Sequence, residues 1–414
     1  MSEFRAQWRN PGDVFSVLLI VGGDVILLAL ACVTGRVFTP VAFSFGWVAY
    51  AISAVVAAVG DNKLLARCTP EIPLKVINLK NGYNRDNKSW LLGRFMKDYN
   101  YWMPQDVRER LVRPPVRPDE EDRVAHDPFP ARSSGLEPFP TNVTMGRSNA
   151  ALCITVYRWV DGAKLGLPDR DWAWWSGFFM SILQLGVAAI PWGLHNNWNI
   201  FIATAAGTVM AYASASLPQW QIEKWTPERR KKDIAITQGN GNQHVIVILG
   251  ADHGFDMEAL AAARSPELGS TRIYTSILAF LWLVLLVTCC GIETDTWYLI
   301  AVGGLGMVQN LVVAGVPRKP AALGLPIELD RNLKDGQAAP NIFAEPKVMW
   351  SIMEFEKRFP GCGNALVKEF FPGDLLEWEV SWWASEDLAE REGLLSTQRR
   401  KAWDKAYEAA QEGR

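Results

Sequence analysis

The sequence of 414 residues lacks several features that would assign a function directly. Six cysteines are present, but none stands in a CxxC or other metal-type spacing, and there are only four histidines. This pattern predicts reduced, packed thiols and no metal centre. We also expect no signal peptide, because residues 1–13 are polar and the apolar run after them is too long and has no small-residue cleavage site.

Motifs for nucleic acids and nucleotides are also absent. The formal net charge is −2, and no basic patch is interleaved with aromatic side chains, so nucleic acid is not an expected partner. The glycines at 239–241 and 250–254 lack the Lys-Ser/Thr ending of a P-loop and the spacing of a dinucleotide fingerprint. We therefore predict no cofactor.

Charge is nearly absent from six long stretches, and this is the strongest signal in the sequence. Each has about 20 residues, the length that crosses the hydrocarbon core of a bilayer. Soluble core helices rarely run this long without one charged face. The 19 tryptophans agree with a membrane location, since Trp prefers the headgroup zone. We predict an α-helical polytopic protein in contact with a lipid bilayer, with six transmembrane helices at 14–35, 40–60, 172–194, 198–217, 273–291 and 297–316.

The connectors predict how these helices pair. Short connectors at 36–39, 195–197 and 292–296 would join them into three antiparallel hairpins. The long segments must then share one side of the membrane with both termini. Lys and Arg flank the spans on that side, whereas the short connectors offer only Arg36 against Glu293 and Asp295. The positive-inside bias therefore places the long segments and both termini in the cytosol of a plasma membrane or an endomembrane.

These boundaries divide the chain into six parts. They are the N-terminus with hairpin 1 (1–60), a cytosolic loop (61–171), hairpin 2 (172–217), a second cytosolic loop (218–272), hairpin 3 (273–316) and a cytosolic helical tail (317–414). The stretch 112–148, rich in Pro, Arg and acidic residues, is expected to be flexible. Strand-like runs in both loops, with Asn-Gly turns and a β-hairpin in the second, predict a small α+β domain built from the long loops and the tail.

Four polar residues fall inside the predicted spans: Asp24, Gln184, Gln309 and Asn310. Polar groups at membrane depth are costly unless they are paired, so these residues are candidates for function. An equally weighted alternative is structural, with a protonated Asp24 hydrogen-bonded to Gln184 or Gln309.

Small residues form stripes on two of the predicted spans. They are Ala203, Gly207, Ala211 and Ala215 on the fourth and Gly303, Gly304 and Gly306 on the sixth. We predict helix contact faces there, because small residues let backbones approach in a membrane. A glycine-lined conduit is the alternative.

A second candidate cluster lies in the long loops. His244, Asp252 and His253 would act as an acid/base pair or as metal ligands if the fold brought them together. With so few histidines in the chain, a metal site is the less favoured interpretation.

Several stretches resemble a widespread, uncharacterised family of multipass integral membrane proteins of filamentous (ascomycete) fungi. They include KVINLKNGYNRDNKSWLLGR at 75–94, QLGVAAIPWG at 184–193 and DTWYLIAVGGLGMVQNLVVAGVPR at 295–318, with further matches at 39–62, 170–177 and 239–250. The resemblance implies a multipass membrane fold but carries no assigned chemistry. Relatives often have a basic residue where this chain has Gln238, which argues against anion binding at that turn.

Three functions remain compatible with these features. The favoured one is a non-enzymatic membrane scaffold or interaction protein with a cytosolic domain that binds a protein partner. The second is a pathway for small solutes or ions through the bundle. The third is a membrane-embedded enzyme for a terpenoid-like substrate of fungal secondary metabolism, with Asp24 as its buried acid. Whether the chain forms a homo-oligomer is left open.

Overall fold

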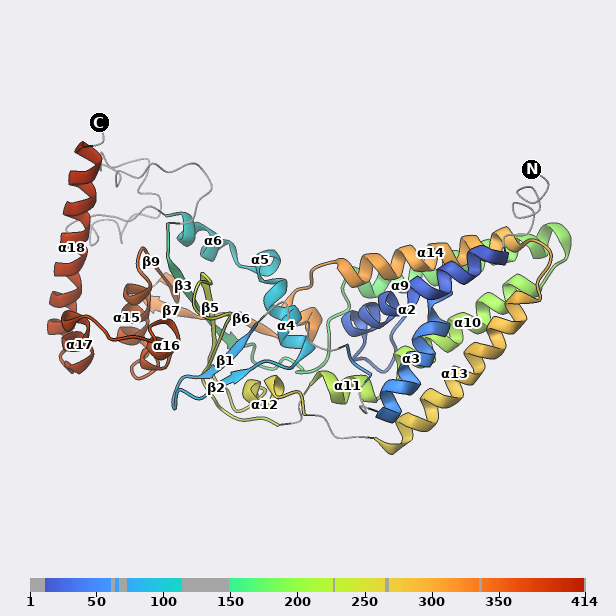
Figure 1. The fold of residues 1–414 in the computed structure, drawn as a ribbon, viewed down its shortest axis with the longest axis horizontal. Coiled ribbons are helices and arrows are strands. Elements are labelled where there is room, and N and C mark those ends of the chain that lie inside the picture. Colours follow the sequence, from blue (N-terminus) through green and yellow to red (C-terminus); the bar gives the residue numbers. More distant parts are fainter. Residues whose placement is uncertain are drawn as a thin grey trace.

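The computed structural model describes residues 12–60, 64–66, 73–113, 149–225, 228–264, 268–334 and 337–412; for 12–21 and a few other positions it describes the backbone alone. Figure 1 shows an elongated helical bundle at one end and a mixed sheet flanked by helices at the other. Nearly all of the predicted flexible stretch at 112–148 lies outside the described residues.

Six apolar helices form the bundle. They are α2 (Gly12–Val33), α3 (Gly46–Gly60), α9 (Trp172–His195), α10 (Asn199–Ala215), α13 (Gly269–Cys290) and α14 (Thr296–Gly315). Of these, α9, α13 and α14 are long and apolar enough to cross a membrane, while the described apolar parts of the other three are shorter. Large apolar side chains such as Phe179, Ile273 and Phe280 are exposed on their outer faces. Such faces suit lipid better than water.

The helix pairing differs from the predicted three hairpins. Helices α9 and α10 pack against each other, as expected for the second hairpin. Helices α13 and α14 share a tight turn, with Asp295 in the left-handed conformation, but then diverge. Helix α13 packs on α3 and α10, whereas α14 packs on α2 and α9. Interior space between α13 and α14 is therefore filled by other parts of the chain.

The prediction of one membrane-length helix over 40–60 is wrong. Residues 39–45 are not helical, and α3 begins only at Gly46. The connector at 36–39 also lies at the end of the bundle next to the sheet. There the Nε atom of Arg36 donates to the carbonyl of Pro168 at 2.6 Å. Helix α2 therefore begins at the far end of the bundle and ends beside the sheet (Figure 1).

The mixed sheet confirms the prediction that both loops build one α+β unit. Its strand order is β2-β1-β4-β5-β3-β6, with β9 also paired to β3. The strands are β1 (Lys75–Asn78), β2 (Asn84–Asp86), β3 (Leu152–Trp159), β4 (Ile234–Thr237), β5 (His244–Ile248), β6 (Ile327–Leu329) and β9 (Ile342–Glu345). Strands β3 and β5 are parallel, and the other pairs are antiparallel. The tail, predicted to be helical, thus adds two strands and a separate ribbon of β7 (Arg331–Lys334) and β8 (Gln337–Pro340).

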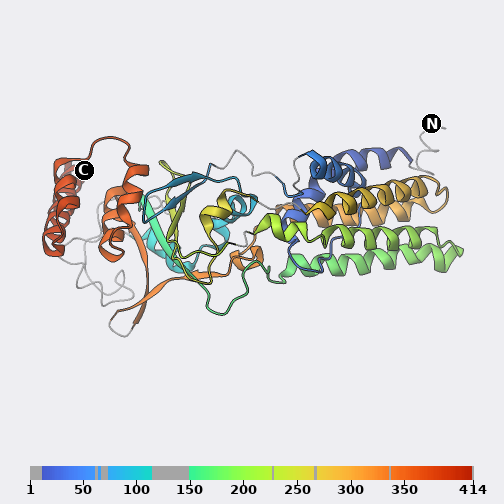
Figure 2. The same cartoon turned by 90° about the horizontal axis from the view of Figure 1, so that it is seen from below.

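Helices cover both faces of the sheet (Figures 1 and 2). The tail helices α15 (Val348–Arg358), α16 (Gly363–Phe370), α17 (Glu377–Ala384) and α18 (Leu388–Glu412) share a core with the face that carries Ile154 and Val247. The other face contacts α4 (Trp90–Lys97), α5 (Tyr99–Trp102), α6 (Gln105–Val112) and α12 (Met257–Ala261). Between sheet and bundle lie α11 (Gln219–Lys224) and the 3-10 turn η2 (Pro320–Leu323).

Candidate functional site in the helical bundle

A non-helical segment runs inside the bundle. Residues 39–45, the inner segment, are all buried, and Ala42 and Ser44 have no exposed surface. Helices α9, α10, α13 and α14 supply side chains or backbone that contact this segment. Backbone that is not helical leaves its N–H and C=O groups without intrahelical partners, so other groups must satisfy them.

Glycines make room for the inner segment. A Cβ atom at Gly306 would lie 1.8 Å from the carbonyl oxygen of Phe43, and one at Gly177 would lie 2.2 Å from that of Pro40. At Gly207 and Gly303 a Cβ would lie 2.5 Å and 2.1 Å from the rings of Phe43 and Phe45. Close backbone approach at these glycines of α10 and α14 is therefore as predicted, but the partner is the non-helical inner segment and not another helix. Among the described parts of the chain, a Cβ at Gly304 would have no neighbour within 4 Å, so Gly304 does not belong to the face.

Two of the predicted polar residues bind the inner segment. The Nε2 atom of Gln184 donates to the carbonyls of Phe43 and Val302, both at 2.7 Å. The Nδ2 atom of Asn310 donates to the carbonyl of Ala42 at 3.1 Å. Through these bonds α9 and α14 hold carbonyl groups that a helix would have paired internally.

The amide oxygens beside the inner segment have no partner within the described protein. The Oε1 atoms of Gln184 and Gln309 and the Oδ1 atom of Asn310 are all buried and unpaired, although Gln309 donates through Nε2 to Ser176 at 3.1 Å. Each unsatisfied acceptor costs about 1–3 kcal/mol. Buried polar groups are rarely left in this state. In the described bundle the Nε1 donor of Trp282 and the hydroxyl of Thr204 are also buried and unpaired.

Three aromatic rings stack on one another inside the bundle. The Trp282 ring of α13 lies between two others, with centroids 6.1 Å from Phe43 and 5.4 Å from Trp47 and interplanar angles of 8° and 6°. The Nε1 atom of Trp47 donates to the carbonyl of Ala42 at 3.0 Å, which ties the stack to the inner segment. All three rings are buried.

Asp24 does not join this group. Its residue is exposed on α2, and neither Gln184 nor Gln309 bonds to it. The predicted hydrogen bond from Asp24 is therefore wrong, because Gln184 donates to the inner segment and Gln309 donates to Ser176 of α9 instead. A role for Asp24 as a buried acid also loses its structural basis.

The predicted cluster of His244, Asp252 and His253 is not formed. His244 opens β5 and packs edge-on against Tyr99, with ring centroids 5.0 Å apart, and burial lowers its pKa to about 4. The other two residues follow the opposite end of that strand, where His253 Nε2 lies 3.7 Å from Asp161. Within the described ranges, no group of three or more His, Cys, Asp or Glu could hold a metal ion.

Two basic residues, Lys224 and Arg318, are buried at the end of the bundle nearest the sheet. The Nζ atom of Lys224 donates to the carbonyl of Thr34 at 2.6 Å and lies 5.8 Å and 5.6 Å from the ring centroids of Trp90 and Trp225. Arg318 is equally buried, and its Nε atom is 2.7 Å from a carboxylate oxygen of Asp171. Sequence reasoning treated both cations only as flanking charges, since nothing in the local sequence shows that they become buried.

Lys224 is expected to make the stability of the protein depend on pH. Burial lowers its pKa from 10.5 to about 7. The unfolded chain then binds more protons than the folded one between these values, so stability should rise as the pH increases through this window. We expect a gain of about 2 kcal/mol from about pH 7 to about pH 9. Thermal unfolding of Lys224→Met in detergent should show a flatter profile, and an unchanged slope would contradict this assignment.

Comparisons with protein-family models, curated proteins and solved structures found nothing that matches this chain. The resemblance to the fungal membrane proteins therefore stays a prediction.

Proposed function

We propose that this chain is a multipass membrane protein whose bundle forms a pathway for small uncharged polar solutes, water included. The observation that carries the proposal is the set of unpaired amide oxygens beside the inner segment. Non-helical backbone at membrane depth occurs where protein buries it or where it lines a hydrated cavity. The aromatic stack would be the closed barrier of this pathway.

The proposed topology has five crossings and one re-entrant element. Helices α2, α9, α10, α13 and α14 cross the membrane. The inner segment enters from the sheet end, and α3 returns to the same end, where Arg272 Nε donates to the carbonyl of Ala58 at 3.2 Å. Positive flanking residues put the sheet in the cytosol. An odd number of crossings puts the start of α2 on the other side, in place of the predicted cytosolic N-terminus.

The charges around the interior favour uncharged solutes. Helix α3 begins at Gly46 inside the bundle, so the positive end of its dipole faces the interior. At the sheet end Lys224, whose pKa burial lowers to about 7, adds part of a positive charge, and Arg318 adds a guanidinium that is paired with Asp171. A positive barrier of this kind excludes cations, and unpaired amide oxygens repel anions. A neutral molecule rich in O–H or N–H donors matches both conditions.

This proposal changes the order of the three hypotheses. The enzyme hypothesis relied on Asp24, which is exposed and apart from the other polar residues. A scaffold role is compatible with the fold but does not account for the polar bundle interior. We therefore place the pathway first and keep partner binding by the cytosolic part as a second, separate proposal.

Removing one ring of the stack should open the pathway. In liposomes that contain purified protein, Phe43→Ala is expected to speed entry of urea or glycerol after an osmotic step by about tenfold, which corresponds to lowering the barrier by about 1.4 kcal/mol. Stopped-flow light scattering measures this rate. The control is Phe179→Ala, which removes a ring from the exposed face of α9 and should leave the rate unchanged.

Two results would count against the proposal. One is a solute rate for Phe43→Ala equal to that of protein-free liposomes, with circular dichroism showing a folded protein. The other is selective potassium or proton flux in the same liposomes, which would replace the uncharged solute by an ion.

A further inference from the structure

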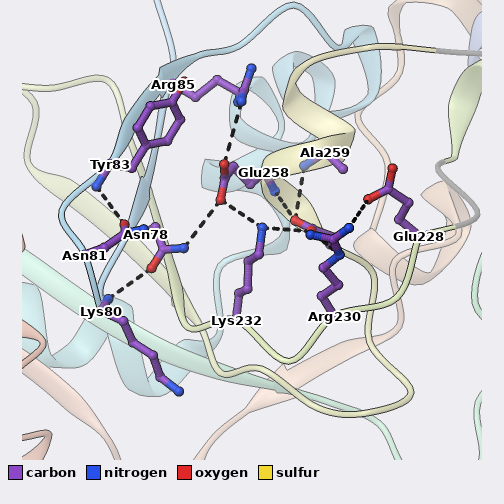
Figure 3. A network of polar contacts seen from close by, with 11 residues as sticks. Asn78, Lys80, Asn81, Tyr83, Arg85, Glu228, Arg230, Lys232, Glu258 and Ala259 are labelled. Atoms are coloured by element: carbon purple, nitrogen blue, oxygen red, sulfur yellow. Dashed lines mark hydrogen bonds and ion pairs between the residues drawn. The ribbon is translucent and has the colours of Figure 1, made fainter.

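A charged pocket lies in the sheet part, apart from the proposed pathway. It is a cavity of about 190 Å³ between β2, residues 228–232 and α12. Arg85 lines the cavity from β2. Arg230 and Lys232 line it from residues 228–232, and Arg264 lines it from the residues after α12. Figure 3 shows the first three converging with Glu228 and Glu258. Three chain segments thus supply four cations to one small cavity.

The carboxylates of the pocket are already bonded within the protein. Asp256 accepts from the backbone N–H groups of Glu258 and Ala259, each at 3.1 Å, and caps α12. Its other oxygen lies 2.8 Å from Lys232 Nζ, which also lies 3.0 Å from Glu258. These contacts fix the charge states: burial raises the pKa of Glu258, but bonds from Lys232 and Asn78 outweigh it and leave the pKa lowered.

The guanidinium groups, in contrast, keep spare donors. Arg85 reaches Glu258 only at 3.6 Å, and its buried Nε atom has no hydrogen-bond partner. Arg230 makes only long contacts, at 3.5 Å to Glu228 and 3.9 Å to Asp256. Arg264 makes no ion pair with any part of the chain that the structure describes. Donors therefore exceed acceptors, and the four cations outnumber the three carboxylates by one.

We propose that this pocket binds the phosphate group of a small ester or of a lipid headgroup. Guanidinium forks match the paired oxygens of phosphate, and such charge-assisted bonds are roughly twice as strong as neutral ones. The cavity has the volume of about six water molecules, since each takes about 30 Å³ in the liquid. That volume accommodates a phosphate with a few further atoms.

Titration calorimetry of the full chain in detergent tests this inference. Inorganic phosphate and glycerol phosphate are the soluble probes, and phosphatidylcholine vesicles with phosphatidic acid test the lipid source. Arg264→Gln is expected to weaken phosphate binding about tenfold, the usual effect of losing one charge-assisted hydrogen bond. The control is Arg158→Gln, an arginine paired with Glu328 on strands β3 and β6, which should bind as the wild type does.

A second variant separates ligand binding from damage to the fold. Glu228→Gln removes the carboxylate that lies near Arg230, so it should tighten phosphate binding about fivefold and make that binding fall more steeply with salt. A variant that merely destabilises the pocket would not bind more tightly. The inference is overturned if the wild type binds none of the three probes, or if Arg264→Gln and Glu228→Gln both bind phosphate as the wild type does. This test does not measure solute flux, so the phosphate proposal can be wrong while the proposed solute pathway is right.

Discussion

Gly306→Ala is expected to destabilise the protein by about 3 kcal/mol or more, because overpacking beside a rigid backbone is among the costlier changes in a packed interior. The added Cβ would overlap the carbonyl oxygen of Phe43 and would also lie 2.7 Å from the Nε2 atom of Gln184. Neither group moves freely, since one is backbone and the other holds two carbonyls. Thermal unfolding in detergent measures the loss.

Gly304→Ala provides a matched control two residues away on the same helix. No atom of the described residues lies within 4 Å of its Cβ position, so we expect the effect of the better helix propensity of alanine, a gain of about 0.5–1 kcal/mol. The two substitutions should therefore change stability in opposite directions. Equal effects would mean that the inner segment does not pack against α14.

The helices of the bundle could be predicted from length and apolarity, but the inner segment could not. Residues 40–60 are as apolar as a true span, and hydropathy does not distinguish one helix from an extended stretch followed by a half-helix. The difference arises from glycines on other helices: Gly177, Gly207 and Gly306 leave the space that residues 39–45 fill. That complementarity is tertiary and is invisible in any local window.

For the polar candidates, too, the sequence predicts which residues matter but not what they contact. Gln184, Gln309 and Asn310 could be found because a polar group inside an apolar run is conspicuous. Their bonding partners could not, since Gln184 and Asn310 bond to backbone carbonyls, which every residue carries. Asp24 has the same sequence signal, yet it faces outward because of the way α2 is rotated. Burial, more than residue type, separates the two cases.

In the sheet, the strands were predictable and their partners only partly so. The runs around β1, β3, β4 and β5 alternate or are continuously apolar, and both loops contribute as expected. The tail strands β6 and β9 are short and half-buried, so they carry little local signal. The pocket cations come from segments far apart in sequence, and only strand pairing brings Arg85 near Lys232.

Asp171→Asn is expected to cost about 3 kcal/mol, the usual penalty when one partner of a buried ion pair is removed. Asparagine is as good an N-cap as aspartate, so the bond to the backbone N–H of Trp174, 3.1 Å long, should survive. What is lost is the charge that faces Arg318, whose side chain is 1% exposed. An unpaired guanidinium would then remain at the junction of bundle and sheet.

Two further variants test whether burial of the ion pair explains the loss of stability in Asp171→Asn. Glu328→Gln breaks the pair with Arg158, in which the two side chains are 45% and 54% exposed, and should leave stability almost unchanged because water screens an exposed pair. Adding Arg318→Met to Asp171→Asn should recover part of the loss, because a methionine leaves no buried charge without a partner. If Asp171→Asn unfolds no more easily than Glu328→Gln, the pair with Arg318 does not hold the sheet to the bundle.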